Sequence, residues 1–200
     1  MLKIGITGNI GSGKTTVSKV FELLGIPVFY ADDQAKQVMT ADPILIREIK
    51  ATFGPGAYFD DGSLNRKYLA GIVFNNAIEL QKLNAIVHPA VFRAFDNWVL
   101  QYPDAVYVLK EAALLFESNS YQMCRYSIVV TAPLQQRLQR VVKRDHITLA
   151  EAESRNARQM PEEEKAKLAD YLITNDESCL VIPQVLHLHE QFTRLARTEP

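Results

Sequence analysis

Short apolar runs alternate with longer amphipathic stretches along the chain, which is typical of an α/β protein. The run at 105–109 is rich in β-branched residues and is the best candidate for a strand buried inside a parallel sheet. The pattern predicts a three-layer α/β/α fold, with five parallel strands, helices on both faces and right-handed crossovers. The predicted strands span residues 2–6, 26–30, 105–109, 126–131 and 170–174.

Local signals divide the amphipathic stretches into helices. A helical pattern over 34–53 is interrupted at Asp42-Pro43, where aspartate can cap a new helix and proline fits its first position. Thr148 followed by Glu151 forms a capping box. Because Pro89 disfavours helical conformation in the residue before it, two separate helices are predicted around it. The other predicted helices span residues 16–24, 65–75, 77–87, 89–100, 133–144, 146–160, 161–167 and 178–196.

More helix lies between the second and third predicted strands than one crossover needs. We therefore expect a single domain over residues 1–200, with a core formed by 1–33 and 104–200 and a helical insertion at about 60–101. Such an insertion is a natural platform for a second substrate beside the core.

Residues Gly8–Thr15 form a complete G-x-x-x-x-G-K-[ST] phosphate loop between the first strand and the first helix, the context that this motif requires. Glycines let successive N–H groups point at phosphate oxygens, and the helix start adds partial positive charge. Lys14 is expected to reach the β- and γ-phosphates and the Thr15 hydroxyl to ligate Mg²⁺. This context argues against a chance match and predicts triphosphate binding by Gly11, Ser12, Gly13, Lys14, Thr15 and Thr16.

Two acidic residues follow predicted strands at the edge where open α/β sheets bind ligands. Asp32 comes after the second strand and could hold or deprotonate an acceptor hydroxyl, or it could only cap the next helix. Glu111 comes after the third strand, where it could act on Mg²⁺ through water or be an ordinary surface glutamate. The sequence leaves both alternatives open.

Arginines recur at helical spacing near the end of the chain. Arg137, Arg140 and Arg144 are separated by three and four residues, and Arg155 and Arg158 repeat this spacing on the following helix. A solvated basic face is the default interpretation. Next to a phosphate loop, however, the pattern favours a lid at about 140–160 that closes over a triphosphate and excludes water.

Composition narrows the choice of partners and compartment. With 48% hydrophobic and 22% charged residues and a net charge of −1, the chain is typical of a soluble globular protein, and neither nucleic acid nor membrane is an expected partner. Cys124 and Cys179 have no metal-ligand or C-x-x-C spacing and are expected to be reduced. The first residues already form a predicted strand and no apolar run approaches 18 residues, so we expect a cytoplasmic protein.

Taken together, several stretches resemble the dephospho-CoA kinase family along nearly the whole chain. The phosphate loop alone indicates only a superfamily, whereas the ordered set of the other stretches is highly specific. The matching stretches are Gly5–Thr15, Tyr30-Ala31-Asp32, Leu64-Asn65-Arg66 with Val73-Phe74, Leu83–Pro89, Ala113–Glu117, Gln136-Arg137-Leu138 with Arg144, Arg155–Gln159 and Ala169–Asn175.

The resemblance implies transfer of the ATP γ-phosphate to the 3′-hydroxyl of the ribose in dephospho-CoA, with Mg²⁺ as cofactor. It makes Asp32 the catalytic base and places Arg140 over the ATP phosphates and Asn175 near adenine. The chain is expected to act as a monomer or a weak homo-oligomer. The residues implied on the acceptor side are Asp32, Arg66, His88, Leu114, Leu115 and Glu117.

Three positions depart from the family pattern. Tyr30 replaces the first aspartate of Asp-Ala-Asp, Glu111 stands where the family usually has aspartate, and Ala113 replaces a proline. The extra methylene of Glu111 favours metal contact through water. None of the three changes removes an indispensable atom.

Two alternatives share part of this pattern. Another phosphate-loop kinase, for a nucleoside monophosphate or a shikimate-like acceptor, would share the loop and lid but not Leu64-Asn65-Arg66 together with Ile86-Val87-His88-Pro89. A nucleotide-gated switch would carry Asn-Lys-x-Asp and Asp-x-x-Gly, and neither string occurs in the sequence.

Overall fold

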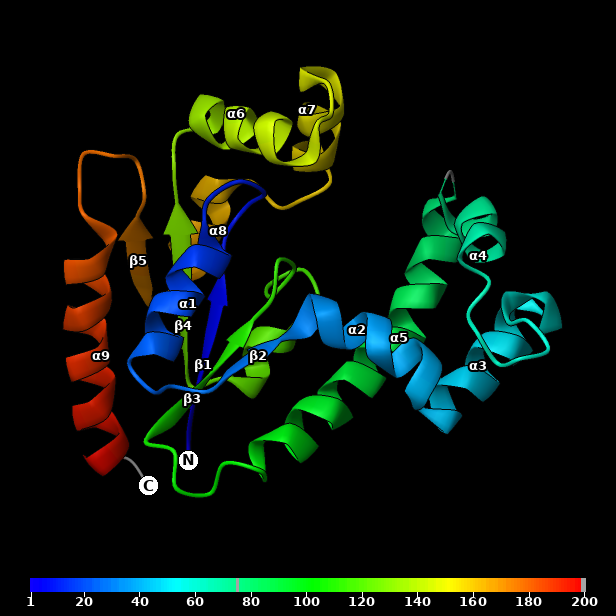
Figure 1. Cartoon of the computed structure of the whole chain (residues 1–200), viewed down its shortest axis with the longest axis horizontal. Helices are drawn as coiled ribbons and strands as arrows, with labels where there is room; N and C mark the ends of the chain where they lie inside the picture. Colours follow the sequence, from blue (N-terminus) through cyan, green and yellow to red (C-terminus); the bar gives the residue numbers. More distant parts are fainter. Residues whose placement is uncertain (75, 199–200) are drawn as a thin grey trace. The chain divides into compact units, whose positions relative to one another are not determined.

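The computed structural model describes residues 1–74 and 76–198, and it divides into two compact units (Figure 1). The first unit combines Met1–Tyr30 with Tyr102–Pro200, and the second is Ala31–Gln101. The second unit thus begins well before the insertion expected at about 60–101. The last residue of the predicted helix 65–75 and the last two of the chain lie outside the described residues.

The first unit contains a five-stranded parallel sheet in the order β2-β3-β1-β4-β5, which confirms the predicted fold class. Because β1 lies between β3 and β4, the strand order reverses at its carboxyl end, where such sheets bind ligands. The phosphate loop follows β1 directly. The strands are β1 (Leu2–Thr7), β2 (Val28–Tyr30), β3 (Tyr107–Glu111), β4 (Tyr126–Thr131) and β5 (Tyr171–Thr174).

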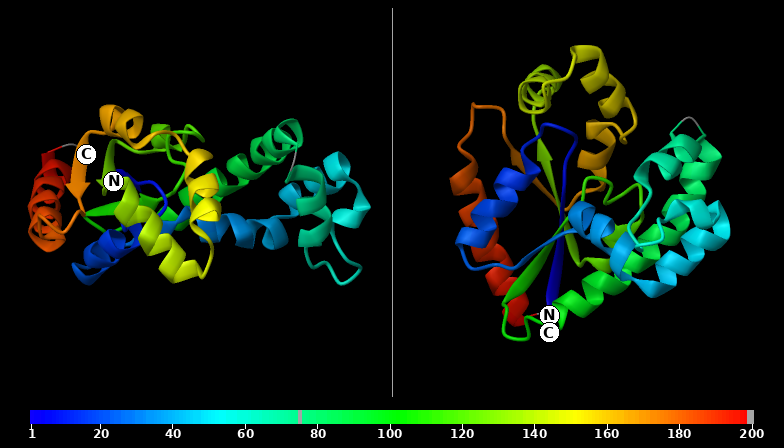
Figure 2. Two further views of the ribbon diagram at one scale, coloured as in Figure 1. Left: turned by 90° about the horizontal axis from the view of Figure 1, so that it is seen from above. Right: turned by 45° about the vertical axis from the view of Figure 1, so that its right-hand side comes forward.

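Helices of this unit cover the sheet on both faces (Figure 2). On one face α1 and α9 place Phe21 and Phe192 against the strands, where both rings are fully buried with Ile4 and Tyr107. On the other face α8 packs against β4. The helices are α1 (Lys14–Leu23), α6 (Leu134–Asp145), α7 (Leu149–Ala157), α8 (Glu162–Leu168) and α9 (Val181–Thr198), with a 3₁₀ turn at Ser120–Met123.

The second unit is helical, and its longest helix corrects one prediction. The predicted break before Pro89 is wrong, because α5 continues through the proline. Proline removes one backbone donor from a helix interior. Here a single apolar stripe of Val87, Val91, Phe95 and Val99 runs across that position and packs α5 on its neighbours, so burial outweighs the local penalty. The helices are α2 (Ala31–Ala41), α3 (Pro43–Phe53), α4 (Arg66–Val73) and α5 (Ala77–Val99), with a 3₁₀ turn at Pro55–Ala57.

Several predicted boundaries shift by a few residues. The strand predicted at 105–109 occupies 107–111, because Lys110 and Glu111 are buried in the ladder despite their charge. The helix expected from 146 begins at Leu149, since His146 adopts a left-handed conformation (φ 53°) and Thr148 forms the expected capping box. Asp42 caps α3 as expected, accepting hydrogen bonds from two backbone N–H groups.

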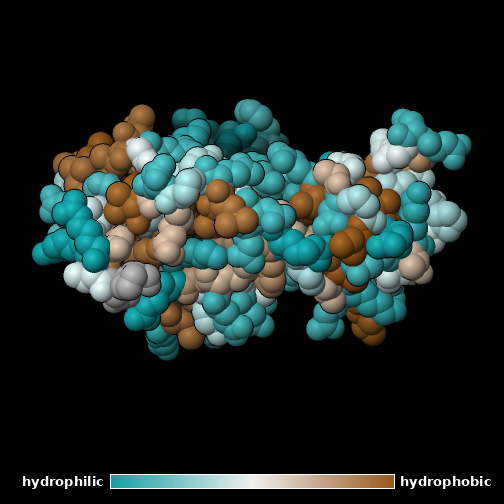
Figure 3. Space-filling view, turned by 90° about the horizontal axis from the view of Figure 1, so that it is seen from below, coloured by the Kyte–Doolittle hydropathy of each residue, from teal (hydrophilic) through white to brown (hydrophobic). Residues whose placement is uncertain are grey.

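The described helices include none that is both long enough and apolar enough to span a bilayer. On the face drawn in Figure 3, hydrophobic residues occur in separate groups among hydrophilic ones.

Candidate active site

The phosphate loop is a tight turn that ends at the start of α1. The Ser12 N–H donates to the Asn9 carbonyl at 3.0 Å, and Gly11 (φ 78°) and Gly13 (φ 93°) adopt left-handed conformations that favour glycine. Because α1 begins at Lys14, its unpaired N–H groups face the loop. The turn borders a cavity of about 330 Å³ lined by Asn9, Gly11, Ser12, Gly13, Lys14, Thr15, Thr16, Arg140 and Arg144.

Asn175, the residue that follows β5, supports this loop by a hydrogen bond to its backbone. The Asn175 side-chain amide donates to the Ser12 carbonyl at 2.8 Å, and a Cβ on Gly13 would lie 2.3 Å from that same amide nitrogen. A side chain at Gly13 would therefore displace Asn175. The structure thus places the Asn175 amide against the loop backbone. Its position near adenine, which the resemblance implies, stays a prediction.

Glu111 lies between the two loop residues that are expected to meet the phosphates and the metal. Its Oε1 is 3.4 Å from the Lys14 Nζ, and its Oε2 accepts a hydrogen bond from the Thr15 hydroxyl at 3.4 Å. Only 7% of the side chain is exposed. Tyr30 pairs with Glu111 across β2 and β3, and burial together with Glu22 and Glu111 raises the pKa of its phenol.

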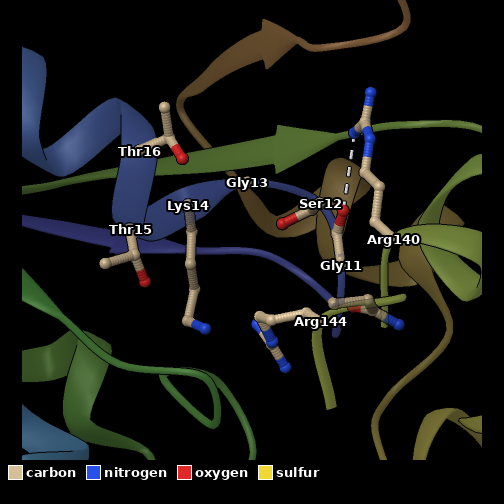
Figure 4. A pocket seen from close by; sticks show the side chains of 9 residues that line it. Gly11, Ser12, Gly13, Lys14, Thr15, Thr16, Arg140 and Arg144 are labelled. Carbon is tan, nitrogen blue, oxygen red and sulfur yellow. Dashed lines mark hydrogen bonds between the residues drawn. The ribbon is translucent and has the colours of Figure 1, made fainter. Parts of the chain in front are cut away.

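The predicted row of arginines has two different roles in the structure. Arg137 is buried and donates to the carbonyl of Ala132 at 2.9 Å and to the side chain of Asn156 at 2.7 Å, so it supports the fold. Arg140 and Arg144 line the cavity (Figure 4). Of the three arginines on α6, Arg140 and Arg144 therefore lie at the cavity and Arg137 does not. Closure of a lid at about 140–160 stays a prediction.

The two cavity arginines differ in how they are held. Arg140 donates to the Gly11 carbonyl at 3.4 Å and to the Asn175 carbonyl at 3.0 Å, which fixes its guanidinium against the loop. Arg144 pairs with its neighbour Asp145 at 2.7 Å, and Asp145 also pairs with Arg155. In Figure 4, Lys14 and Arg144 extend into the same space, and the Arg140 guanidinium turns toward Gly11. Lys14, Arg140 and Arg144 thus give the cavity a cationic lining, which suits phosphate groups.

Glu117, which the resemblance implied on the acceptor side, has partners within the first unit. Its Oε1 lies 2.9 Å from the Lys165 Nζ and accepts a hydrogen bond from the Met160 N–H at 3.0 Å. Lys165 is fully buried and also donates to the Ala113 carbonyl at 3.0 Å. Burial lowers the pKa of Lys165, and the hydrogen bond to Glu117 opposes this shift. Sequence reasoning missed Lys165 because a lysine in a charged helix usually faces solvent.

The other predicted acceptor residues of the first unit are adjacent leucines with different exposure. Leu115 is fully buried. Its side chain packs against Gly5, where an added Cβ would lie only 2.7 Å from a Leu115 methyl group. Leu114 remains 36% exposed and is the one of the pair that can meet a ligand.

The predicted site residues of the second unit lie on helix α2, α4 or α5. Asp32 is exposed in the first turn of α2; since this helix begins at Ala31, Asp32 is not its cap. Arg66 is the exposed first residue of α4, and half-buried His88 stacks on Phe92 with ring centroids 6.4 Å apart. Asp32 follows the end of β2 by two residues, which span at most about 7 Å of chain.

The residues at the loop fit a magnesium ion carried with a nucleotide. The described residues include no group of three His, Cys, Asp or Glu side chains that could hold a metal without other ligands. Mg²⁺ needs no such group, because it commonly binds one or two protein oxygens, substrate phosphates and water. The Thr15 hydroxyl and the Glu111 carboxylate provide oxygens of this kind next to the cavity.

A glycine-rich loop that opens a helix at the switch point of a parallel sheet, with a lysine and an arginine at its cavity, is typical of the phosphate-loop class of nucleotide-binding proteins. The family model for dephospho-CoA kinase matches residues 2–180. The chain belongs to the dephospho-CoA kinase family and is an ATP-dependent kinase.

Relatives and solved structures agree with this assignment over nearly the full length. A dephospho-CoA kinase of Bacteroides fragilis is 36% identical over 188 residues, which cover 94% of this chain and 91% of the relative. A crystal structure from Thermus thermophilus has a TM-score of 0.82 at 36% identity, covering 95% of this chain and 96% of that one. A dephospho-CoA kinase from Campylobacter jejuni has a TM-score of 0.69 at 26% identity, covering 96% and 97%.

Proposed function

We propose that this chain phosphorylates dephospho-CoA on the 3′-hydroxyl of its ribose, using ATP and releasing coenzyme A and ADP. The observation that carries the proposal is the family match over residues 2–180, combined with a cavity that the phosphate loop, Lys14 and Arg140 line together. The loop and Lys14 bind the triphosphate, and Arg140 compensates negative charge that develops on the transferred group.

The donor side binds ATP through backbone groups and one ammonium. The residues proposed here are Gly11, Ser12, Gly13, Lys14, Thr15 and Thr16, with Arg140 over the phosphates. Lys14 is now 3.4 Å from Glu111, so a bound phosphate would replace or share that partner. Asn175 contributes by bracing the loop at Ser12.

A magnesium ion bound with ATP would be held by the Thr15 hydroxyl directly and by Glu111 through water. When bound, it supplies charge neutralisation between the phosphates. Glu111 already accepts a hydrogen bond from Thr15 and lies beside Lys14, so its carboxylate can keep both groups oriented.

Asp32 is the proposed base. Its carboxylate accepts a hydrogen bond from the acceptor hydroxyl and takes the proton while that oxygen bonds to the γ-phosphorus. The bond from the γ-phosphorus to the β,γ-bridging oxygen then breaks, and ADP leaves. Support comes from the short chain that links Asp32 to β2, whose last residue pairs with Glu111.

Binding of dephospho-CoA is proposed for Arg66 and His88 of the second unit and for Leu114, Leu115 and Glu117 of the first. Arg66 suits an acidic phosphate group because its guanidinium is exposed at a helix start. Leu115 and Glu117 would act by shaping the Ala113–Glu117 segment, since one is buried and the other is paired with Lys165.

Turnover with different acceptors tests the proposal. Purified protein, ATP and Mg²⁺ are incubated with dephospho-CoA, AMP, UMP or shikimate, and ADP release is measured by a coupled assay. We expect turnover with dephospho-CoA to be at least about 100-fold above the others, because polar recognition can discriminate between substrates by about 10⁴- to 10⁵-fold. Phosphorus NMR of the product must show a new 3′-phosphate. Equal turnover with another acceptor would overturn the proposal.

We also propose that the protein acts in the cytoplasm, because both substrates are small polar molecules. We further propose that it is a monomer or a weak homo-oligomer. Light scattering over a range of protein concentrations measures the oligomeric state. A stable oligomer at the lowest concentration would contradict this part.

A further inference from the structure

Two residues after helix α7 contact the phosphate loop directly. The Gln159 Oε1 accepts a hydrogen bond from the Ile10 N–H at 2.8 Å. The Met160 carbonyl accepts one from the Asn9 side-chain amide at 3.0 Å. Residues 156–160, which we name the lid exit, lead out of the α6–α7 helix pair into α8. The lid exit is therefore bonded to two successive residues of the loop.

Asn9 and Ile10 occupy positions that the phosphate-loop motif leaves open. Their neighbours on both sides are glycines, which give the loop many backbone conformations when unbound. Asn9 is 2% exposed and Ile10 is half-buried. An N–H at such a place needs a partner, and the Ile10 N–H is bonded to Gln159 rather than directed at the cavity.

The lid exit is itself held on its other side. Asn156 accepts a hydrogen bond from the buried Arg137 at 2.7 Å, and the Met160 N–H donates to Glu117 at 3.0 Å. Glu117 in turn pairs with the fully buried Lys165. The Gln159 backbone is thus anchored on both sides, so its side chain presents an acceptor at a fixed place.

We propose that Gln159 is a positioning residue for phosphate transfer. By holding the Ile10 N–H, it keeps the Asn9-Ile10 half of the loop in the conformation that binds phosphate, and it links the loop to the exit of the lid helices. The inference rests on the proposed binding of ATP at this loop. Gln159 acts through Ile10 and need not touch the nucleotide.

The coupling works in both directions. If the lid exit favours the binding conformation of the loop, bound ATP must favour the bond between Ile10 and Gln159 by the same factor. Binding of ATP should therefore slow hydrogen exchange of the Ile10 amide beyond the general stabilisation of the fold. Loss of the Gln159 acceptor should remove this extra protection.

Three variants test the inference. Gln159→Met keeps the length of the side chain and removes the amide oxygen. Gln159→Glu keeps an oxygen acceptor. Gln191→Met is the matched control, because Gln191 is a half-buried glutamine whose amide donates to the Tyr171 hydroxyl at 3.2 Å, on a helix that does not contribute to the cavity.

We expect Gln159→Met to raise the Kd and KM for ATP about tenfold, the equivalent of one buried hydrogen bond, with a smaller change in kcat. NMR hydrogen exchange should show a faster Ile10 amide in this variant and restored protection in Gln159→Glu. Gln191→Met should leave both the Ile10 amide and ATP binding as in the wild type. Thermal melts show whether each variant is folded.

The outcomes separate this inference from the proposed function. Wild-type ATP affinity or an unchanged Ile10 amide in Gln159→Met would overturn the positioning role. An equal loss in Gln191→Met would also overturn it, because general destabilisation would then explain the effect. If the wild-type protein itself bound no ATP, the proposed function would fail instead, and amide exchange would still report the bond to Ile10.

Discussion

The donor residues and the acceptor residues proposed here differ in how the chain holds them. The phosphate loop has side-chain partners from several distant segments, namely Glu111, Asn175, Arg140 and Gln159. Asp32 and Arg66, by contrast, are exposed near the starts of helices. Preorganised contacts lower the cost of binding a ligand. The donor site is therefore built during folding, whereas the exposed acceptor residues Asp32 and Arg66 can be changed with little effect on the fold.

The strongest test of this contrast is Asp32→Asn. We expect kcat to fall by about 10²- to 10⁴-fold, because the variant cannot accept the proton of the hydroxyl. The Tm and the Kd for ATP should remain close to the wild type, since Asp32 is exposed. Steady-state kinetics, isothermal titration and thermal melts make the comparison. An unchanged kcat would remove Asp32 from the mechanism.

The next largest effect should be on stability rather than turnover. Lys165→Met removes a buried ammonium and leaves Glu117 without that ion pair, so we expect a loss of about 3 kcal/mol in the free energy of unfolding. Urea denaturation measures it. Lys167→Met, an exposed lysine on the same helix, is the matched control and should change little. Equal losses in the two variants would contradict the role given to the buried pair.

Lys14→Ala should combine a loss of binding with a loss of rate. We expect kcat/KM for ATP to fall by roughly 10²-fold, about 2.7 kcal/mol, because one cation over the phosphates is removed. Folding should survive, and melting and circular dichroism check this. Near-normal turnover in a folded variant would contradict the proposed binding of the triphosphate by Lys14.

The smallest predicted effect is on the acceptor side. Arg66→Ala should raise the KM for dephospho-CoA about tenfold by removing a charged hydrogen-bond donor. The KM for ATP and the Tm should not change. Lys67→Ala provides a control, because Lys67 is the neighbouring residue, carries the same charge and is also exposed. If Arg66→Ala instead lowered the Tm and left KM intact, the arginine would be structural and the contrast between the two sides would fail.

Much of the first unit could be predicted because its signals are local. The strand, glycine loop and helix that contain Gly8–Thr15 occur in one short stretch, and apolar runs show the other strands. One helix cap in each unit was also predictable, since both involve residues within four positions: the Thr148–Glu151 capping box in the first and the Asp42 cap in the second.

Features that depend on distant contacts could not be predicted. Burial of Arg137 and Lys165 follows from partners more than a dozen residues away, such as Asn156 and Glu117, and the sequence gives no sign of these pairings. The bond from Ile10 to Gln159 spans 149 positions. The only local hint was that both lie within stretches that resemble the dephospho-CoA kinase family.

The continuous helix α5 lacks one backbone hydrogen bond in the turn before Pro89. Pro89 directly follows His88. Because proline has no N–H, Pro89 cannot donate to the carbonyl of Ala85 one turn earlier, which loses its usual helical hydrogen bond. Any bending of this 23-residue helix is therefore cheapest in that turn. The segments before and after the proline can tilt separately to suit different neighbours, and two crystal forms that disagree about this helix should disagree there first.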